Sequence, residues 1–176
     1  MARKIQLRKT CSIYADDLHF ATMVFPFIEK EINNNTTIKT ILEKNEEENI
    51  EKIINNIGLN SEIKEKIRQI DWSNTNIKKI RNNFEVLKQD IKEKNNIDII
   101  VLGRNLFVQK VNKAIDLWFK NNIEELENIE IQINVINCFS FEENKKIYKI
   151  KDSYDYILKT SGIEEIFETE ELLKAN

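Results

Sequence analysis

Residues 97–105 read Ile97-Asp98-Ile99-Ile100-Val101-Leu102-Gly103-Arg104-Asn105, a short apolar run that ends at a glycine. The run is rich in β-branched residues and too short for a buried helix, and an amphipathic helical pattern lies on either side of it. This arrangement is typical of a central strand in a parallel sheet. The sequence therefore predicts an α/β fold. Because such sheets bind ligands where strands end and helices begin, the Gly103–Asn105 turn is the first candidate for a site.

Four further segments have the composition of strands, so the expected sheet has about five strands. The last of them alternates Ile and Val with polar residues, a pattern typical of a half-exposed strand toward a sheet edge. The expected segments are Thr10–Tyr14, Thr37–Leu42, a strand near Arg68–Trp72 after a short helical turn, and Ile129–Phe139.

Amphipathic helices are expected between these strands, because apolar residues recur there at steps of three and four. The first begins after a cap at Asp16 or Asp17, with a kink at Pro26. The second covers Glu46–Ile57 and stops at Gly58 in a left-handed conformation. The inward residues of the first helix are Leu18, Ala21, Phe25, Ile28 and Ile32, and those of the second are Ile50, Ile53, Ile54 and Ile57.

The second half of the chain continues the pattern. A helix with the stripe Ile77, Ile80, Phe84, Leu87 and Ile91 follows a cap at Ser73 or Asn74. The remaining expected helices are about Leu106–Asn121, Phe141–Tyr148 and Ser153–Thr160, and an acidic amphipathic helix at about 163–174. Together these elements predict a three-layer fold, with a mostly parallel central sheet and helices on both faces. With 176 residues, the chain is expected to form one domain, 1–176.

Composition excludes several classes of protein. The net charge of −3 and the isoelectric point near 5.5 argue against a nonspecific nucleic-acid binder. The basic start lacks the apolar region of a secretory signal, and no segment is apolar over the length that a bilayer requires. We therefore expect a cytoplasmic protein that binds neither membrane nor nucleic acid directly. Cys11 and Cys138 fall in strand-like segments, so reduced, buried thiols are favoured over a disulfide or redox pair.

The inventory of reactive residues is sparse. A nucleotide-hydrolysing site of the P-loop type needs a GxxxxGK[ST] loop, which the sequence does not contain. The first strand instead runs into Asp16 and Asp17, whose carboxylates would repel a phosphate at a helix start. His19 is the one histidine, which excludes a site of several histidines and a Ser-His-Asp triad. We therefore expect no catalytic residues, no metal and no cofactor.

A binding site at the ends of the strands is the remaining prediction. Arg104 offers a fork of donors to an anionic ligand, and Asn105 can cap the next helix. The alternative is that Arg104 pairs with a carboxylate such as Asp71 or Asp16. Aromatic residues near element ends could supply apolar contacts, although such residues are more often part of a core. The candidate pocket consists of Tyr14, Asp16, Trp72, Gly103, Arg104 and Asn105.

The order of these elements resembles the MEDS sensory domain family, a RecA-like α/β module of bacterial and archaeal regulators. The resemblance covers most of the chain. Lys9 and Arg104 stand where many members carry a histidine and an acidic residue. The matching segments are Thr10-Cys11-Ser12-Ile13-Tyr14 with Asp16-Asp17, Val24-Phe25-Pro26-Phe27-Ile28, Ile54-Asn55-Asn56-Ile57-Gly58-Leu59 before Ile67–Trp72, the strand ending at Gly103, and Val135–Phe139.

This resemblance implies a degenerate RecA-like fold and a sensory role. The expected function is therefore a non-catalytic sensory or regulatory protein that binds a small anionic ligand, a signalling partner, or both. The partner would be a histidine kinase or a transcription regulator, and a homo-oligomer stays open. Two alternatives remain: a small enzyme acting on a nucleotide or phosphoester, and a pure interaction antagonist that binds no small ligand.

Overall fold

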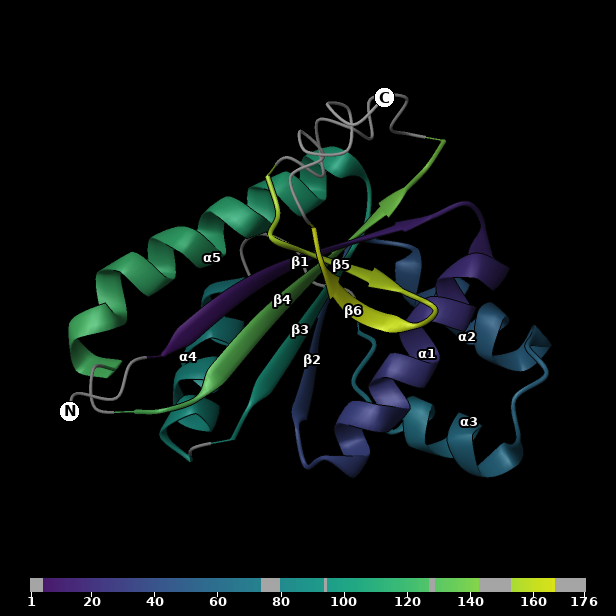
Figure 1. Cartoon of the computed structure of the whole chain (residues 1–176), viewed down its shortest axis with the longest axis horizontal. Coiled ribbons are helices and arrows are strands. Elements are labelled where there is room, and N and C mark those ends of the chain that lie inside the picture. The colour runs from purple at the N-terminus through teal and green to yellow at the C-terminus, as the bar shows by residue number, and fades with distance from the viewer. Residues whose placement is uncertain (1–4, 74–79, 94, 127–128, 143–152, 167–176) are drawn as a thin grey trace, which may run out of the picture.

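The computed structural model describes residues 5–73, 80–93, 95–126, 129–142 and 153–166. Six strands in this part of the chain join one sheet of order β2-β3-β4-β1-β5-β6 (Figure 1). The strands are β1 (Gln6–Tyr14), β2 (Thr37–Leu42), β3 (Ile97–Leu102), β4 (Gln132–Ser140), β5 (Tyr156–Lys159) and β6 (Gly162–Glu165). All neighbouring strands are parallel except β5 and β6, which form an antiparallel pair. The predicted α/β class with a mostly parallel sheet is confirmed.

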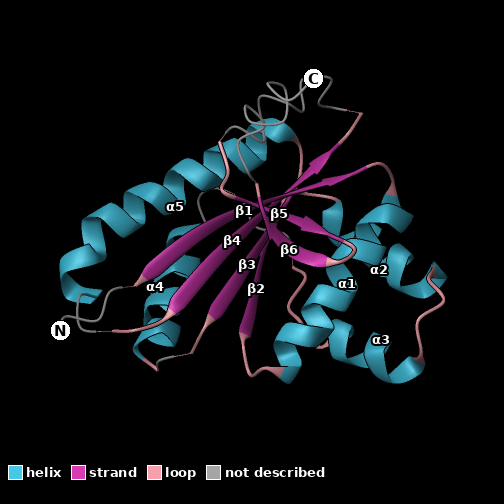
Figure 2. Ribbon diagram, viewed as in Figure 1, coloured by secondary structure: helices cyan, strands magenta, loops and turns pink. Residues whose placement is uncertain are grey.

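Helices cover both faces of this sheet, as Figure 2 shows. They are α1 (Asp17–Asn33), α2 (Glu46–Asn56), α3 (Ser61–Arg68), α4 (Ile80–Lys92) and α5 (Asn105–Leu126). Helices α1, α2 and α3 contribute to one apolar cluster, which includes Ile100 and Leu102 of β3. Helices α4 and α5 contribute to the other, with Ile99 and Val101. Alternate residues of β3 thus pack into two different cores, on opposite faces of the sheet. This explains why all but one of its residues are apolar.

Strands β2 and β3, which are rich in β-branched residues, have the predicted bounds. Strand β1 begins earlier than expected, at Gln6, and α5 ends later, at Leu126. The described members of the predicted α4 stripe, Ile80, Phe84, Leu87 and Ile91, are buried. Ile77 and the proposed cap at Asn74 lie outside the described residues.

The prediction that the Ile129–Phe139 segment lies toward a sheet edge is wrong. Strand β4 is central, between β3 and β1, and it is buried along nearly its whole length. Neighbouring side chains bond to its buried asparagines, although Asn137 Oδ1 has no hydrogen-bond partner among the described residues. The Thr10 hydroxyl donates to Asn134 Oδ1 at 2.8 Å, and Asn137 Nδ2 donates to Asn112 Oδ1 at 3.1 Å. The alternation of apolar and polar residues in this segment therefore reflects hydrogen bonding within the core and not exposure to solvent.

Helix α1 begins as predicted, because the side chain of Asp16 accepts a hydrogen bond from the His19 amide at 2.8 Å. Pro26 lies inside the helix, which continues to Asn33. Ala21, Phe25 and Ile28 are buried as expected. Leu18 is 64% exposed, so its predicted inward position is wrong. It lies in the first turn, before the helix reaches the body of the sheet.

Two predictions around α2 and α3 are also wrong. Helix α2 ends at Asn56, its C-cap Ile57 is extended, and Gly58 has no positive φ. The strand predicted near Arg68–Trp72 is absent, because α3 continues to Arg68 and a loop follows. Helix α3 is capped at its start by Asn60, whose side chain accepts a hydrogen bond from the Ile63 amide at 2.9 Å.

The helix predicted at Ser153–Thr160 is also absent. Its place is taken by β5, which turns at Gly162 into β6. Gly162 has a φ of +116°, a conformation that side chains disfavour. The first residues of the helix predicted at 163–174 are therefore strand, and residues 167–174 lie outside the described part, as does most of the predicted Phe141–Tyr148 helix.

No helix among the described residues combines the length and apolar character needed to cross a membrane. Cys11 and Cys138 are not joined by a disulfide and are fully buried, as predicted. Burial raises the pKa of the Cys138 thiol, with Cys11 adding a smaller effect in the same direction.

Candidate functional site

At the carboxyl edge of the sheet, Arg104 is bound to Glu43, the residue that follows β2. The Arg104 amide donates to Glu43 Oε2 at 2.7 Å, and Nε and Nη2 donate to Oε1 at 2.9 and 2.5 Å. The hydrogen bonds from the Arg104 side chain are the main reason that the pKa of Glu43 is lowered. Arg104 therefore has a carboxylate partner, but it is neither Asp71 nor Asp16, the two that the sequence suggested.

Gly103 makes this contact sterically possible. A Cβ atom at Gly103 would lie 2.7 Å from Glu43 Cβ and 2.7 Å from Phe107 Cδ1. Both distances are shorter than any real Cβ contact, so a side chain here would push apart the ends of β2 and α5. The glycine is thus explained by close packing between neighbouring elements.

Tyr14 and Asp16 lie at the end of β1, and β4 separates them from the end of β3. Two steps between strands span about 10 Å. Tyr14 packs edge to face on Phe20, with 5.4 Å between ring centroids, and Asp16 caps α1. Asn105 is the first residue of α5. The structure thus forms two groups from the predicted pocket residues, Tyr14 with Asp16 and Gly103 with Arg104 and Asn105.

Trp72 belongs to neither group. It is buried in the α1 face of the core, with its ring centroid 6.4 Å from that of Phe25. Its indole Nε1 donates to the Ile67 carbonyl at 2.7 Å. Trp72 therefore anchors the loop after α3.

A hollow of about 590 Å³ lies along the outer edge of β2, and we name it the edge hollow. One wall comes from α1, α3 and the loop 69–73, the other comes from α4, and β2 lies between them. It was not predicted, because its lining comes from segments that are far apart in the sequence. The lining residues are Ile32, Ile38, Lys39, Thr40, Ile41, Lys66, Gln69, Ile70, Asp71, Ser73, Asn83, Phe84, Val86, Leu87 and Ile99.

Hydrogen bonds hold the loop that forms the first wall. The Thr40 hydroxyl donates to the Asp71 carbonyl at 2.5 Å, and the Ser73 amide donates to Asp71 Oδ1 at 3.0 Å. The first bond joins the loop to β2 without using the β2 backbone, and the second lies within the loop.

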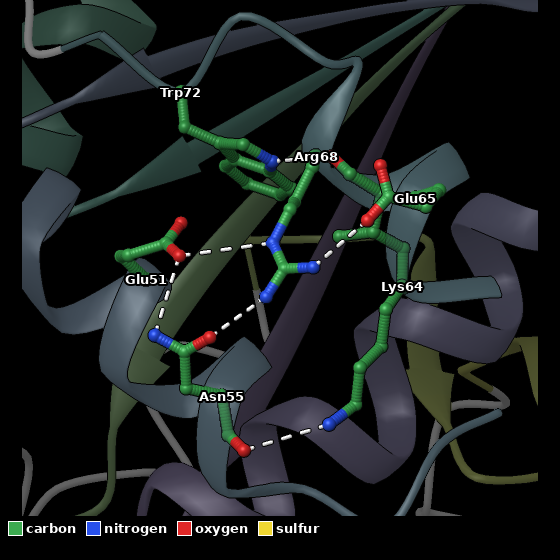
Figure 3. Close-up of polar contacts among 7 residues, drawn as sticks. Glu51, Asn55, Lys64, Glu65, Arg68 and Trp72 are labelled. Atoms are coloured by element: carbon green, nitrogen blue, oxygen red, sulfur yellow. Dashed lines mark hydrogen bonds and ion pairs between the residues drawn. The ribbon is translucent and has the colours of Figure 1, made fainter. Parts of the chain in front are cut away.

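A network around Arg68 fixes α3 against α2, as Figure 3 shows. Arg68 Nη2 donates to Asn55 Oδ1 at 2.7 Å, and Nη1 donates to Glu65 Oε1 at 3.0 Å. Arg68 Nε lies 3.7 Å from Glu51 Oε1. This network and the buried Trp72 hold α3 and the loop 69–73, which form the first wall, against the rest of the fold.

A row of buried polar side chains crosses the sheet under α1. Asn134 of β4 lies opposite Arg8 of β1 and opposite Asp98 of β3. Asp98 is 5% exposed, and its Oδ2 has no hydrogen-bond partner among the described residues. Burial raises the pKa of Asp98 to about 7, and the charge of Glu31 adds to the rise. A hydrogen bond with Asn134 and the charge of Arg8 act in the opposite direction.

One signal for this row is present in the sequence, an aspartate inside an otherwise apolar strand. In the described residues, no group of three or more His, Cys, Asp or Glu side chains is placed to hold a metal ion.

Comparison with known proteins does not assign this chain to a group: no protein-family model matches it, and no curated protein is significantly similar to it. The arrangement of layers defines it as a three-layer α/β protein.

Replacing Gly103 by alanine should destabilise the fold by about 1–3 kcal/mol, because the added methyl group overlaps Glu43 and Phe107. Gly58→Ala is the matched control, since a Cβ there meets nothing within 4 Å. Denaturant unfolding followed by circular dichroism measures both. Equal unfolding free energies for the two variants would contradict the packing role of Gly103.

Replacing Asp98 by asparagine should remove a pH dependence of stability. The pKa of Asp98 is raised from its ordinary 3.8 to about 7. Its carboxyl group therefore favours folding when protonated, and this contribution is lost as the pH rises from about 4 to 7. The free energy of unfolding of Asp98→Asn should exceed that of the wild type by an amount that grows over that range to about 4 kcal/mol.

Thermal or denaturant unfolding at a series of pH values measures this difference. Asp155→Asn, at an exposed position, is the control for a change of carboxylate to amide. A constant difference between Asp98→Asn and the wild type from pH 4 to 8 would show that Asp98 is ionised throughout.

Proposed function

We propose that this chain is a non-catalytic regulatory protein that acts by binding a signalling partner, a histidine kinase or a transcription regulator, in the cytoplasm. The single observation that carries the proposal is the edge hollow. It has a volume within the range of binding clefts, and its lining mixes aliphatic residues with a few charged and polar ones. The resemblance of the ordered elements to MEDS sensory domains supports the same class.

The Arg104 pair favours a protein partner over a small anionic ligand. A guanidinium that is already bound by a carboxylate offers an anion little net positive charge. Glu43 would also stay close to any anion at Arg104 and repel it, since its side chain is 15% exposed and held in place. The ligand hypothesis at the carboxyl edge would require this pair to open.

The proposal is tested in two assays on the purified full chain. In the first, proteins captured from the native host are identified, and the captured kinase or regulator is assayed with and without the chain. We expect the chain to change autophosphorylation or DNA binding by that partner. A captured partner whose activity does not respond would contradict a regulatory role.

The second assay tests the rival enzymatic function. The chain is incubated with ATP or GTP and magnesium, and release of phosphate is measured. We expect no turnover above that of an Asp16→Asn variant. Sustained hydrolysis that this substitution abolishes would establish an enzyme.

A further inference from the structure

The floor of the edge hollow is the side of β2 that pairs with no strand among the described residues. Strand β2 ends the sheet and pairs only with β3 in the described part of the chain. The Thr37 amide donates to Asn96 O at 2.8 Å, and the Glu43 amide donates to Leu102 O at 2.9 Å, so odd-numbered residues bond toward β3. Because backbone groups alternate along a strand, the N–H and C=O groups of Ile38 and Thr40 point outward.

We propose that the edge hollow binds an extended peptide segment of the partner protein, which adds to the sheet as a strand beside β2. This inference rests on the proposed function and specifies how the partner is recognised. Ile38 and Thr40 both line the hollow, and their outward groups lie one strand repeat apart. They can form backbone hydrogen bonds with an added strand, which is a common mode of peptide recognition.

The walls define the side chains of this peptide. Successive residues of an added strand point to opposite faces of the sheet, so they meet opposite walls. On the α1 face the wall presents Ile32 and Ile70, and on the α4 face it presents Val86 and Leu87. Val86 is 51% exposed, although it is aliphatic. Aliphatic side chains on both sides of the peptide therefore fit this hollow.

Charge adds a preference for acidic residues. Among the described charged residues that line the hollow, Asp71 is acidic and Lys39 is already paired with Asp90 at 2.9 Å, so the remaining cation is Lys66. Lys66 has a partially exposed pair with Glu62 on its own helix, at 3.3 Å, and pairs of this kind are weak. A carboxylate on the peptide can therefore attract Lys66.

The walls also favour a peptide over a second copy of the chain. The β2 edge lies recessed between helices of both outer layers. A second copy would bring its own α3 and α4 beside its β2 edge, and these would meet the same walls before the two strands reached pairing distance. A single extended segment is about as thick as one strand and has no such layers.

The test uses a phage-displayed library of random short peptides, selected on the full-length chain. We expect enriched sequences with alternating aliphatic residues and a net negative charge. Thr40→Pro removes one outward N–H and leaves the bonds to β3, since proline is tolerated at such edge positions. It should weaken binding of the enriched peptides at least tenfold.

Thr40→Val is the matched control. It loses the hydroxyl bond to Asp71 and keeps the backbone N–H, so it should bind the peptides nearly as well as the wild type. If Thr40→Pro fails to fold, Val86→Asp tests the same hollow from the α4 wall. Its control is Leu117→Asp, at a 60% exposed position on α5 that does not line the hollow.

Three outcomes would overturn the inference: no peptide is enriched, the enriched peptides bind both members of a variant pair equally, or sedimentation shows a dimer that Thr40→Pro dissociates. The last outcome would identify a second copy as the occupant. Peptide binding at β2 without any effect on a signalling partner would instead contradict only the proposed function.

Discussion

The main constraint on this structure is that a parallel sheet must bury both of its faces while its outermost strands pair on one side only. Strands β3 and β4 are almost fully buried, so helices are required above and below them. The chain supplies α1, α2 and α3 on one face and α4 and α5 on the other. The first crossover carries the chain from central β1 to β2 at the edge, and no strand in the described part of the chain lies beyond the outer backbone groups of β2.

An open strand edge is a hazard for a soluble protein, because it offers a template for pairing with another chain. Here α1, α3 and the 69–73 loop flank the β2 edge on one face of the sheet, and α4 flanks it on the other. The Arg68 network and buried Trp72 hold one wall, and the salt bridge between Lys39 and Asp90, at 2.9 Å, joins β2 to the other. The same geometry that discourages sheet-to-sheet association leaves room for a single strand.

Elements with a strong local pattern could be predicted from the sequence. Strands β2 and β3, which are rich in β-branched residues, have the predicted bounds, and Asp16 caps α1 as its position before an amphipathic segment indicated. The misplaced elements depend on distant partners. Asn134 in β4 is buried because Thr10 bonds to it, 124 residues away, and no local pattern reveals that bond. The β5–β6 hairpin was missed for a similar reason, since β5 is positioned by pairing with β1.

The candidate site shows the same limit. The sequence identified the turn after β3 and allowed for a carboxylate partner of Arg104, but it could not identify Glu43, which is brought there only by the pairing of β2 with β3. The edge hollow is lined by four separate segments of the chain and has no motif of its own. It depends on the order of the strands, which places β2 at the end of the sheet and so leaves its outer side next to the hollow.

Residue-resolved amide hydrogen exchange on the free protein tests the central claim most directly, because it reports whether each amide of β2 is bonded. The account predicts an alternating pattern, with slow exchange at Lys39 and Ile41 and fast exchange at Ile38 and Thr40. Equal protection at all four amides would show that the outer side of β2 is already paired, and would contradict the account.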